Sequence, residues 1–410
     1  MSDHFELFVG IDWGSEKHRV CMLDLEGKTV DQRWIEHTGD SLRELVEWLR
    51  IKTGHAPGSL GVAIEIPRGA VVETLVENGF AVFSINPKQL DRFRDRYSPA
   101  GAKDDRRDAL VLADSLRTDL HCFHRVKLDE PTIIRLRELS RLEDDVAQEQ
   151  NRLHNRLREQ LRRFFPQLLV LCPAANEPWL WDLFQAAPFP AKAAKLSTAR
   201  LEGVLKKHRI RRVDATKVQA VVSARALTLA PGAAEAASEH ALLLLPRLRL
   251  LEQQREHIAK RVQTLLTELT QRKDHEETPE HRDAAILLSL PGVGRKVAAT
   301  MLSEASEAIA ERDYHALRCY AGSAPVTRQS GKKTVILMRQ GCNERLRNAL
   351  YHWARVSIIC DPKAKTMYAG MRARGHSHGR ALRGLADRWI AVLISMLRHN
   401  SLYDSKKRAA

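Results

Sequence analysis

The stretch Phe8-Val9-Gly10-Ile11-Asp12-Trp13-Gly14-Ser15 decides the fold of the amino-terminal part of this chain. Apolar residues alternate from Phe5 up to Asp12, which is typical of a strand that ends in a carboxylate. Two further strands are expected at Val20–Leu25 and Thr29–Ile35, on either side of the turn Glu26-Gly27-Lys28. The pattern therefore predicts a three-stranded meander whose first strand ends in an acid.

Helices and strands then alternate. The helix at Ser41–Ile51, with Asp40 as its N-cap, precedes a strand at Leu60–Ile66. The expected elements after these are a helix at Val71–Glu77, a strand at Ala81–Ile85 and a helix at Lys103–Leu116. A meander followed by this alternation is the order of a ribonuclease-H-like sheet. The predicted fold class is thus α/β to about residue 125, followed by an all-α remainder.

The composition of the chain indicates which class of partner it binds. The chain has 410 residues, enough for two or three domains, and its 66 Lys and Arg exceed its 51 Asp and Glu to give a net charge of +15. Such an excess favours nucleic acid as partner, with a membrane surface as the weaker alternative. The apolar run Trp389–Leu397 is too short to span a bilayer, and the six cysteines form no C-x-x-C pair. A reduced cytoplasm is the expected location.

The rest of the chain is predicted to be helical. Apolar residues recur at three- and four-residue steps over Leu139–Phe164 and in a seven-residue repeat over Leu244–Leu269, which is broken only by Arg255. Both patterns indicate helices that pack on each other or on a second copy. The predicted domains are 1–125 (carboxylate domain), 126–282 (helical coiled-coil linker with an insertion near 173–237) and 283–410 (helical carboxy-terminal domain).

Four carboxylates of the first segment are candidate metal ligands. Asp12 and Glu65 end two strands, while Asp105 and Asp108 lie three residues apart on one helical face. Phosphodiester chemistry uses divalent metal on oxygen ligands, and Mg²⁺ favours carboxylates. Taken singly, a strand-end Asp is usually a turn or cap residue, and the run Lys103–Asp108 reads as a solvated charged face. Their coincidence in one α/β segment of a basic chain favours a metal site.

These residues carry a specific resemblance. The motifs Gly-Ile-Asp-Trp-Gly-Ser-Glu-Lys-His, Ile-Glu and Lys-Asp-Asp-Arg-Arg-Asp-Ala resemble the amino-terminal domain of insertion-sequence-110 transposases, which is similar to RuvC-type Holliday-junction resolvases. The family pattern Lys-x-Asp-x-x-Asp-Ala places its aspartates at Asp105 and Asp108. Asp104 is a departure, because the family usually has a neutral residue there, and it leaves open whether Asp104 or Asp105 is the third ligand.

A turn in the last segment is a candidate phosphate contact. Pro291-Gly292-Val293-Gly294-Arg295-Lys296 joins two apolar helical stretches in the form of a helix-hairpin-helix. Its glycines let backbone N–H groups approach a phosphate, and Arg295 and Lys296 add charge. The alternative is a plain inter-helix turn. The arginine-rich tail, with Arg345 and Arg347 among its members, is also expected largely to meet phosphate.

A serine follows in Arg328-Gln329-Ser330-Gly331-Lys332-Lys333. On spacing alone, a Ser before Gly is most often a turn residue. The Pro-Gly-x-Gly turn, the Tyr-Ala-Gly…Pro element and this Ser-Gly resemble the family's second domain, which supplies a serine nucleophile, and Ser330 matches it. Ser323 is the competing candidate. Arg328, Lys332 and Lys333 are expected to contact nucleic acid.

The resemblance implies a recombinase that uses Mg²⁺ (or Mn²⁺), forms a covalent phosphoserine link to DNA, is guided by a structured RNA from the element's non-coding end, and acts as a homo-oligomer from dimer to tetramer. Three alternatives remain. A hydrolytic junction resolvase would use the carboxylates with water, and an actin-like ATPase or sugar kinase would share Gly-Ile-Asp-Trp-Gly-Ser. A non-catalytic nucleic-acid-binding protein would use the carboxylates structurally.

Overall fold

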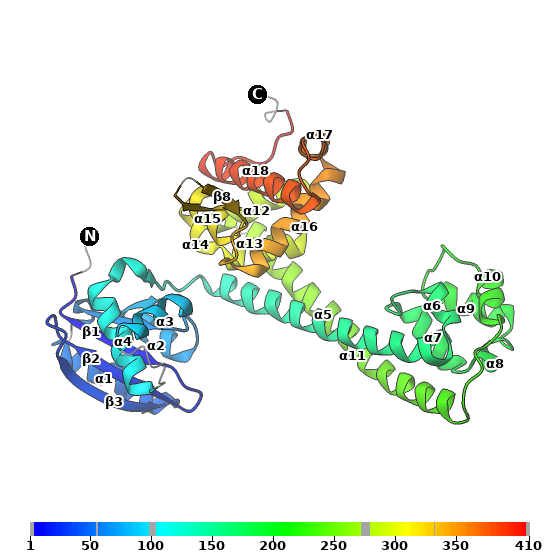
Figure 1. Ribbon diagram of the computed structural model, residues 1–410, viewed down its shortest axis with the longest axis horizontal. Helices are drawn as coiled ribbons and strands as arrows, with labels where there is room; N and C mark the ends of the chain where they lie inside the picture. Colours follow the sequence, from blue (N-terminus) through cyan, green and yellow to red (C-terminus); the bar gives the residue numbers. More distant parts are fainter. Residues whose placement is uncertain (1–3, 55, 98–103, 272–278, 332, 407–410) are drawn as a thin grey trace. The chain divides into compact units, whose positions relative to one another are not determined.

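The computed structural model describes residues 4–54, 56–97, 104–271, 279–331 and 333–406, with the backbone alone for 279–282 (Figure 1). The chain divides into two compact units, Met1–Asp129 and Glu130–Ala410. Each unit has its own hydrophobic core, so each is described separately.

The first unit is built on a mixed sheet. Strands β1 (Leu7–Asp12), β2 (Lys17–Leu23) and β3 (Thr29–Glu36) form an antiparallel meander. Strands β4 (Leu60–Ile64) and β5 (Ala81–Ser84) continue the sheet parallel to β1, and the two-residue β6 (His124–Arg125) pairs antiparallel with β5. The resulting order, β3-β2-β1-β4-β5-β6, confirms the predicted ribonuclease-H-like order of the first five strands.

Helices cover both faces of this sheet. Helices α1 (Gly39–Lys52) and α2 (Ala70–Glu77) share a core with the side chains of Val9 and Ile11. Helix α4 (Asp105–Thr118) packs with Phe8 on the opposite face, next to α3 (Pro87–Asp95), a helix that the sequence analysis does not predict. The predicted N-cap of α1 was wrong: the hydroxyl of Thr38 accepts the capping hydrogen bond from Ser41 N at 3.3 Å, so the helix begins before Asp40.

Two long helices form the frame of the second unit. Helix α5 (Pro131–Phe164) packs along α11 (Ala233–Gln271) through the predicted apolar residues, except Leu142, which is 47% exposed. Where Arg255 interrupts the apolar repeat, its Nη1 donates to Gln150 Oε1 at 3.1 Å, so a polar contact replaces a leucine layer.

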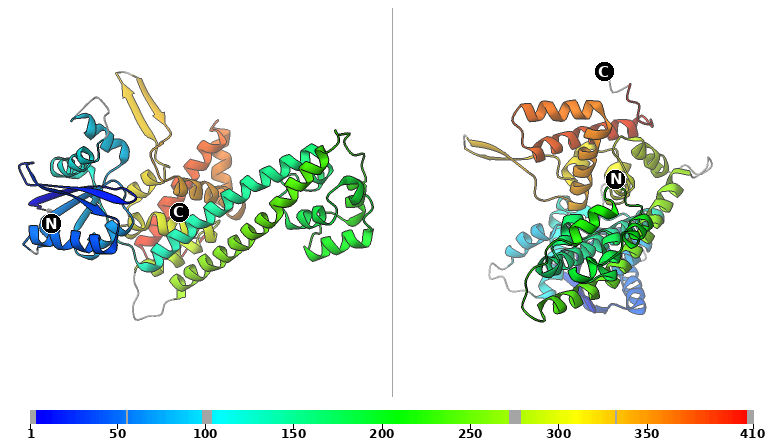
Figure 2. Two further views of the ribbon diagram at one scale, coloured as in Figure 1. Left: turned by 90° about the horizontal axis from the view of Figure 1, so that it is seen from below. Right: turned by 90° about the vertical axis from the view of Figure 1, so that its right-hand side faces the viewer.

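Short helices between α5 and α11 form a lobe. They are α6 (Gln167–Leu171), α7 (Pro178–Ala186), α8 (Pro190–Ala193), α9 (Thr198–Lys207) and α10 (Ala215–Val222). The side chains of Trp179, Trp181 and Phe184 are fully buried within the lobe. Figure 2 shows the lobe joined to the chain where α5 ends and α11 begins.

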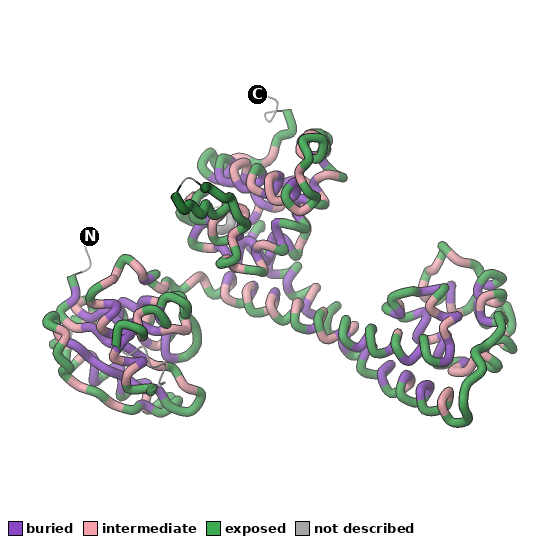
Figure 3. Tube along the Cα trace, viewed as in Figure 1, coloured by how far each residue is buried: buried purple, intermediate pink, exposed green. Residues whose placement is uncertain are grey.

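The carboxy-terminal part packs against the opposite ends of these long helices. Its elements are α12 (Pro279–Ser289), α13 (Arg295–Glu304), α14 (Ser306–Ala310), α15 (Tyr314–Tyr320), strands β7 (Val326–Ser330) and β8 (Lys333–Leu337), then α16 (Glu344–Cys360), α17 (Pro362–Ala373) and α18 (His378–Arg398). Trp353 and Trp389 stack at its centre with ring centroids 5.6 Å apart. The β7–β8 hairpin departs from the all-helical prediction, and every described hairpin residue is exposed (Figure 3). Among the described residues no helix could cross a membrane.

Candidate carboxylate site and serine hairpin

Backbone register brings Asp12 and Glu65 to the same edge of the sheet. Strands β1 and β4 are parallel with Ile11 opposite Ile64, so Asp12 and Glu65 are the next positions along the two chains. Residues of the same parity on these strands, Gly10 and Ala63, face α4. Because side chains alternate along a strand, both carboxylates are on the face that α4 covers.

Helix α4 brings the third and fourth carboxylates to this face. A Cβ on Gly10 would lie 2.0 Å from the carbonyl oxygen of Ala109, so a glycine is needed for α4 to lie this close to β1. Asp108, one residue before Ala109, is consequently buried, with 2% of its surface exposed. Asp105 lies one turn earlier and is exposed, whereas Asp104 is the N-cap and accepts from Arg106 N at 3.1 Å. Capping by Asp104 favours Asp105 as the ligand, although that assignment stays a prediction.

An arginine that the sequence analysis missed connects two of these carboxylates. Arg94 of α3 donates from Nε to Asp108 Oδ1 at 2.8 Å, and its Nη2 lies 3.5 Å from Glu65 Oε2. Its Nη1 donates to Asp91 at 2.7 Å, which fixes the guanidinium on its own helix. The structure thus brings Glu65 and Asp108 together around one positive charge. The local sequence Asp91–Arg96 alternates charges and reads as a solvated surface, so the sequence carries no signal for this role.

The donor set fits a hard divalent cation. Carboxylate oxygens are the ligands such ions prefer, and Asp108 Oδ2 is buried without a hydrogen-bond partner in the described part of the chain. Within the same described residues, no three His, Cys, Asp or Glu side chains are gathered closely enough to hold a metal ion. Glu65 and Asp108 contact the Arg94 guanidinium instead. Metal ligation therefore stays a prediction for Asp12, Glu65, Asp105 and Asp108.

A histidine pair supports the loop after Asp12. Gly14 N donates to His18 Nδ1 at 3.2 Å, and His18 Nε2 lies 2.9 Å from His37 Nδ1. Because His18 Nδ1 accepts, the ring must be neutral to hold the loop. Burial, and then the neighbouring His37, lower the pKa of His18 below its ordinary value. His18 lies within the Gly-Ile-Asp…Lys-His motif, which was the signal that could have identified it.

The candidate nucleophile lies at the tip of the β7–β8 hairpin. Ser330 is the last residue of β7, pairs with Lys333 of β8 and is exposed. Gly331 follows in the left-handed region, with φ of 56°, as the tight turn requires. Arg328 and Lys333 are also exposed on the hairpin, while the predicted contact residue Lys332 lies outside the described residues. Among described residues, no carboxylate or histidine hydrogen-bonds to Ser330.

Ser323, the competing candidate, is held by hydrogen bonds that serve the packing of the fold. Ser323 Oγ is 3.1 Å from Asp387 Oδ1 on α18 and donates at 3.2 Å to the carbonyl oxygen of Arg318. Arg318 in turn donates twice to the Asp387 carboxylate, from Nε at 2.8 Å and Nη2 at 3.0 Å. These contacts hold the turn at the base of the hairpin against α18, which accounts for Ser323 without a catalytic role.

The predicted phosphate-binding turn joins α12 to α13 as expected, but much of it packs internally. A Cβ on Gly292, whose φ is 83°, would meet Ser357 N at 2.9 Å, and Pro291 O accepts from Trp353 Nε1 at 3.0 Å. Arg295 donates to both carboxylate oxygens of Glu143 on α5, at 2.8 and 3.1 Å.

Lys296 forms an ion pair with Asp144 at 2.5 Å and remains half exposed. Gly294 is the N-cap of α13 and has open space around its Cα. Phosphate contact at Pro291, Gly292, Gly294, Arg295 and Lys296 remains untested.

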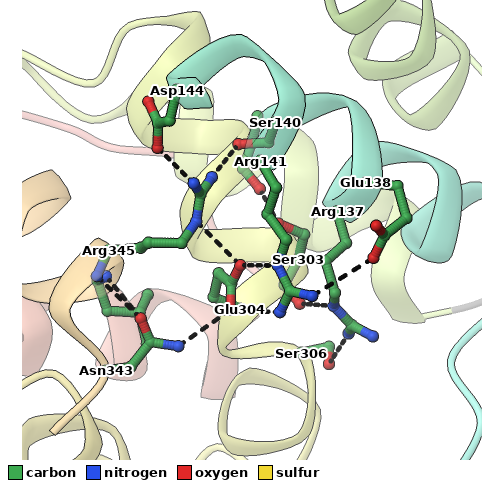
Figure 4. A network of polar contacts seen from close by, with 12 residues as sticks. Arg137, Glu138, Ser140, Arg141, Asp144, Ser303, Glu304, Ser306, Asn343 and Arg345 are labelled. Carbon is green, nitrogen blue, oxygen red and sulfur yellow. Dashed lines mark hydrogen bonds and ion pairs between the residues drawn. The ribbon is translucent and has the colours of Figure 1, made fainter. Parts of the chain in front are cut away.

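A second polar network joins α5 to the carboxy-terminal helices (Figure 4). At its centre, Glu304 accepts from both Arg141 Nε, at 2.8 Å, and Arg345 Nε, at 3.1 Å. Asn343 donates to Glu304 at 3.0 Å, and Arg345 also contacts Asp144 and Ser140. Arg345 is therefore committed to an internal ion pair, unlike the phosphate contact expected of the tail arginines.

Two family models match the chain. One described as "Transposase" matches residues 9–166, which include most of the sheet unit and all of α5. The other, described as "Transposase IS116/IS110/IS902 family", matches residues 284–369, which include the hairpin. Fold and matches together define a transposase, an enzyme that processes DNA. A transposase domain of this Asp-Glu-Asp-Asp type implies the use of a divalent metal.

Relatives extend the match to the whole chain. A mini-circle protein of Streptomyces coelicolor, named as a transposase for IS117, is 30% identical over 416 residues, covering 100% of this chain and 98% of that protein. The 43.6 kDa protein of insertion element IS110, also from Streptomyces coelicolor, is 29% identical over 98% of this chain and 96% of its own length. A Sinorhizobium fredii protein named as transposase y4uE is 49% identical over 52% of this chain, and the match spans 60% of that relative.

The chain belongs to the IS110/IS116/IS902 family of transposases. This membership excludes the ATPase or sugar-kinase alternative and the non-catalytic binding protein.

Proposed function

We propose that this transposase cuts and rejoins DNA through a covalent phosphoserine intermediate formed by Ser330. The observation that carries the proposal is the exposure of Ser330 at a hairpin tip, where Arg328 and Lys333 supply positive charge for a phosphate. The alternative is a resolvase-like nuclease in which water attacks and the hairpin serves for binding alone.

The chemistry is an exchange of phosphodiesters. Ser330 Oγ attacks phosphorus, a new Oγ–P bond forms, and the bond from phosphorus to one deoxyribose oxygen breaks. The serine proton is lost, and the departing deoxyribose oxygen gains a proton to become a hydroxyl. A hydroxyl of another strand then reverses the reaction, so the phosphodiester is re-formed without an external energy source.

The carboxylate site serves the same step. Asp12, Glu65, Asp105 and Asp108 would hold the divalent metal, Mg²⁺ or Mn²⁺, which when bound stabilises charge on the attacked phosphate. No group of the hairpin activates Ser330 in the described chain. As the family resemblance implies, we propose that Ser330 works with the carboxylate unit of another copy in a homo-oligomer, dimer to tetramer.

The proposal also includes a guide RNA and the residues that contact the nucleic-acid backbone. A structured RNA from the element's non-coding region selects DNA sites by base pairing, so the protein needs mainly backbone contacts. Arg328, Lys332 and Lys333 make such contacts from the hairpin. Pro291, Gly292, Gly294, Arg295 and Lys296 make them as a helix-hairpin-helix, chiefly through the backbone N–H groups at the start of α13.

A denaturing gel tests the nucleophile. The protein is incubated with labelled DNA carrying the joined element ends, Mg²⁺ and RNA from the flanking non-coding region. A protein–DNA adduct is expected in the wild type and in the matched hairpin variant Thr334→Ala, and its loss is expected in Ser330→Ala. Cleavage without an adduct in the wild type would establish water as the nucleophile, and an adduct lost in Ser323→Ala but kept in Ser330→Ala would move the assignment.

A further inference from the structure

The lobe between α5 and α11 carries a concentration of positive charge. It lies between the regions that the two family models match. From Phe165 to Gly232 it contains ten Lys and Arg against four Asp and Glu. The densest run, Lys206-Lys207-His208-Arg209-Ile210-Arg211-Arg212, leads from the end of α9 towards α10.

Some members of this run are fixed inward. Lys207 and His208 contact Asp182 of α7 at 2.6 and 2.8 Å, and Arg249 of α11 donates to the same carboxylate. Arg212 donates to both oxygens of Glu177, at 2.8 and 2.9 Å. Each isolated surface pair contributes little, but together they fix the run to α7 at both ends and occupy two of the lobe's four acids.

The remaining members point outward as cations. Lys206, Arg209 and Arg211 are exposed, and no acidic side chain of the described chain forms an ion pair with them. Arg209 has φ of 54°, the left-handed position after a helix where glycine is usual and other residues cost about 1 kcal/mol. A long cation is therefore held at a backbone position that disfavours it, on a run that Lys207, His208 and Arg212 anchor.

We infer that Lys206, Arg209 and Arg211 form a binding surface for the phosphate backbone of duplex DNA, the substrate class of the family. Along α5, Arg141 of the carboxy-terminal junction is 23 residues from Phe164 at the lobe, or roughly 35 Å at 1.5 Å per residue. The surface therefore extends DNA contact by about ten base pairs beyond the carboxy-terminal helices. This contact does not recognise base sequence, because the three flexible cationic side chains bind phosphate.

Salt-dependent binding of the full-length protein tests the inference. A random 40-base-pair duplex is titrated in EDTA, so that the result is independent of the metal and serine assignments. The variant is Lys206→Gln/Arg211→Gln, and the charge-matched control is Lys28→Gln/Arg43→Gln, two exposed cations of the sheet unit. Arg209 is left unchanged because of its backbone conformation.

Loss of one to two phosphate contacts predicts that the slope of log affinity against log salt falls by about 1 to 1.8 in the lobe variant, with an affinity about 10- to 60-fold lower at 0.1 M salt. The control should keep the wild-type slope. Equal losses in both variants would overturn the inference, because net charge alone would explain them. Unchanged duplex binding with weakened binding of single-stranded RNA would also overturn it.

Discussion

Replacing Arg94 with Gln tests the carboxylate site without relying on catalysis. The guanidinium donates a hydrogen bond to Asp108 Oδ1 and lies beside Glu65, and the Asp108 side chain is 3% exposed. Gln keeps an amide donor but removes the charge. Breaking a buried ion pair by removing one partner costs about 3–5 kcal/mol. Since a quarter of the Arg94 side chain is exposed, we expect about 3 kcal/mol, at the lower end of that range.

Amide hydrogen exchange of the full-length protein measures this loss of stability around the carboxylate site. In EDTA, the slowest amides of β1, β4 and α4 should exchange about 100-fold faster in Arg94→Gln, which corresponds to about 3 kcal/mol. Added Mn²⁺ should restore protection more in the variant than in the wild type, because a cation replaces the lost charge. Arg92→Gln, an exposed neighbour on α3, is the control. Wild-type protection in EDTA, or a smaller gain with Mn²⁺, would refute the reasoning.

Three further outcomes follow from the same structure. Asp12→Asn should abolish strand exchange while DNA binding persists in a gel-shift assay, and retained exchange would refute the metal assignment. Glu304→Gln should speed exchange of α13 amides about 100-fold, since it leaves two half-buried arginines without their shared carboxylate, whereas exposed Glu344→Gln should not. His18 has a lowered pKa, so its contribution to stability is full above its ordinary pKa of 6.5 and is lost as pH falls below it. Protection of β1 and β2 should therefore fall between pH 7 and 5.5, and a His18→Asn variant that keeps the same pH dependence would contradict this role.

Local patterns were sufficient for the first five strands of the sheet, whereas the two-residue strand β6 was not predicted. Alternating apolar residues and the Glu26–Lys28 turn predict the meander, and parallel strand ends place Asp12 beside Glu65. The close packing of α4 depends on Gly10, whose missing side chain has no periodic signal but is required by the 2.0 Å approach to Ala109. The candidate ligands were thus accessible from sequence because each is positioned by the end of an element.

The ion-pair partners of the carboxy-terminal arginines could not be predicted from the sequence. Arg295 and Glu143 are 152 residues apart, and Arg345 and Asp144 are 201 apart, so only the tertiary packing of α13 and α16 on α5 shows that these arginines are paired internally. The hairpin was missed because β7 and β8 expose both faces and lack the alternation of a half-buried strand. Arg94 was missed because its helix, α3, was not predicted.

The central claim, that Ser330 becomes covalently attached to DNA, is tested most directly by locating the attachment. The adduct formed with Mg²⁺, joined-end DNA and RNA is digested with nuclease and protease, and the peptide carrying a nucleotide is sequenced by mass spectrometry. We predict a phosphonucleotide on Ser330. A nucleotide on Ser323 or on any other residue, or cleaved DNA ends with no modified peptide, would contradict the account.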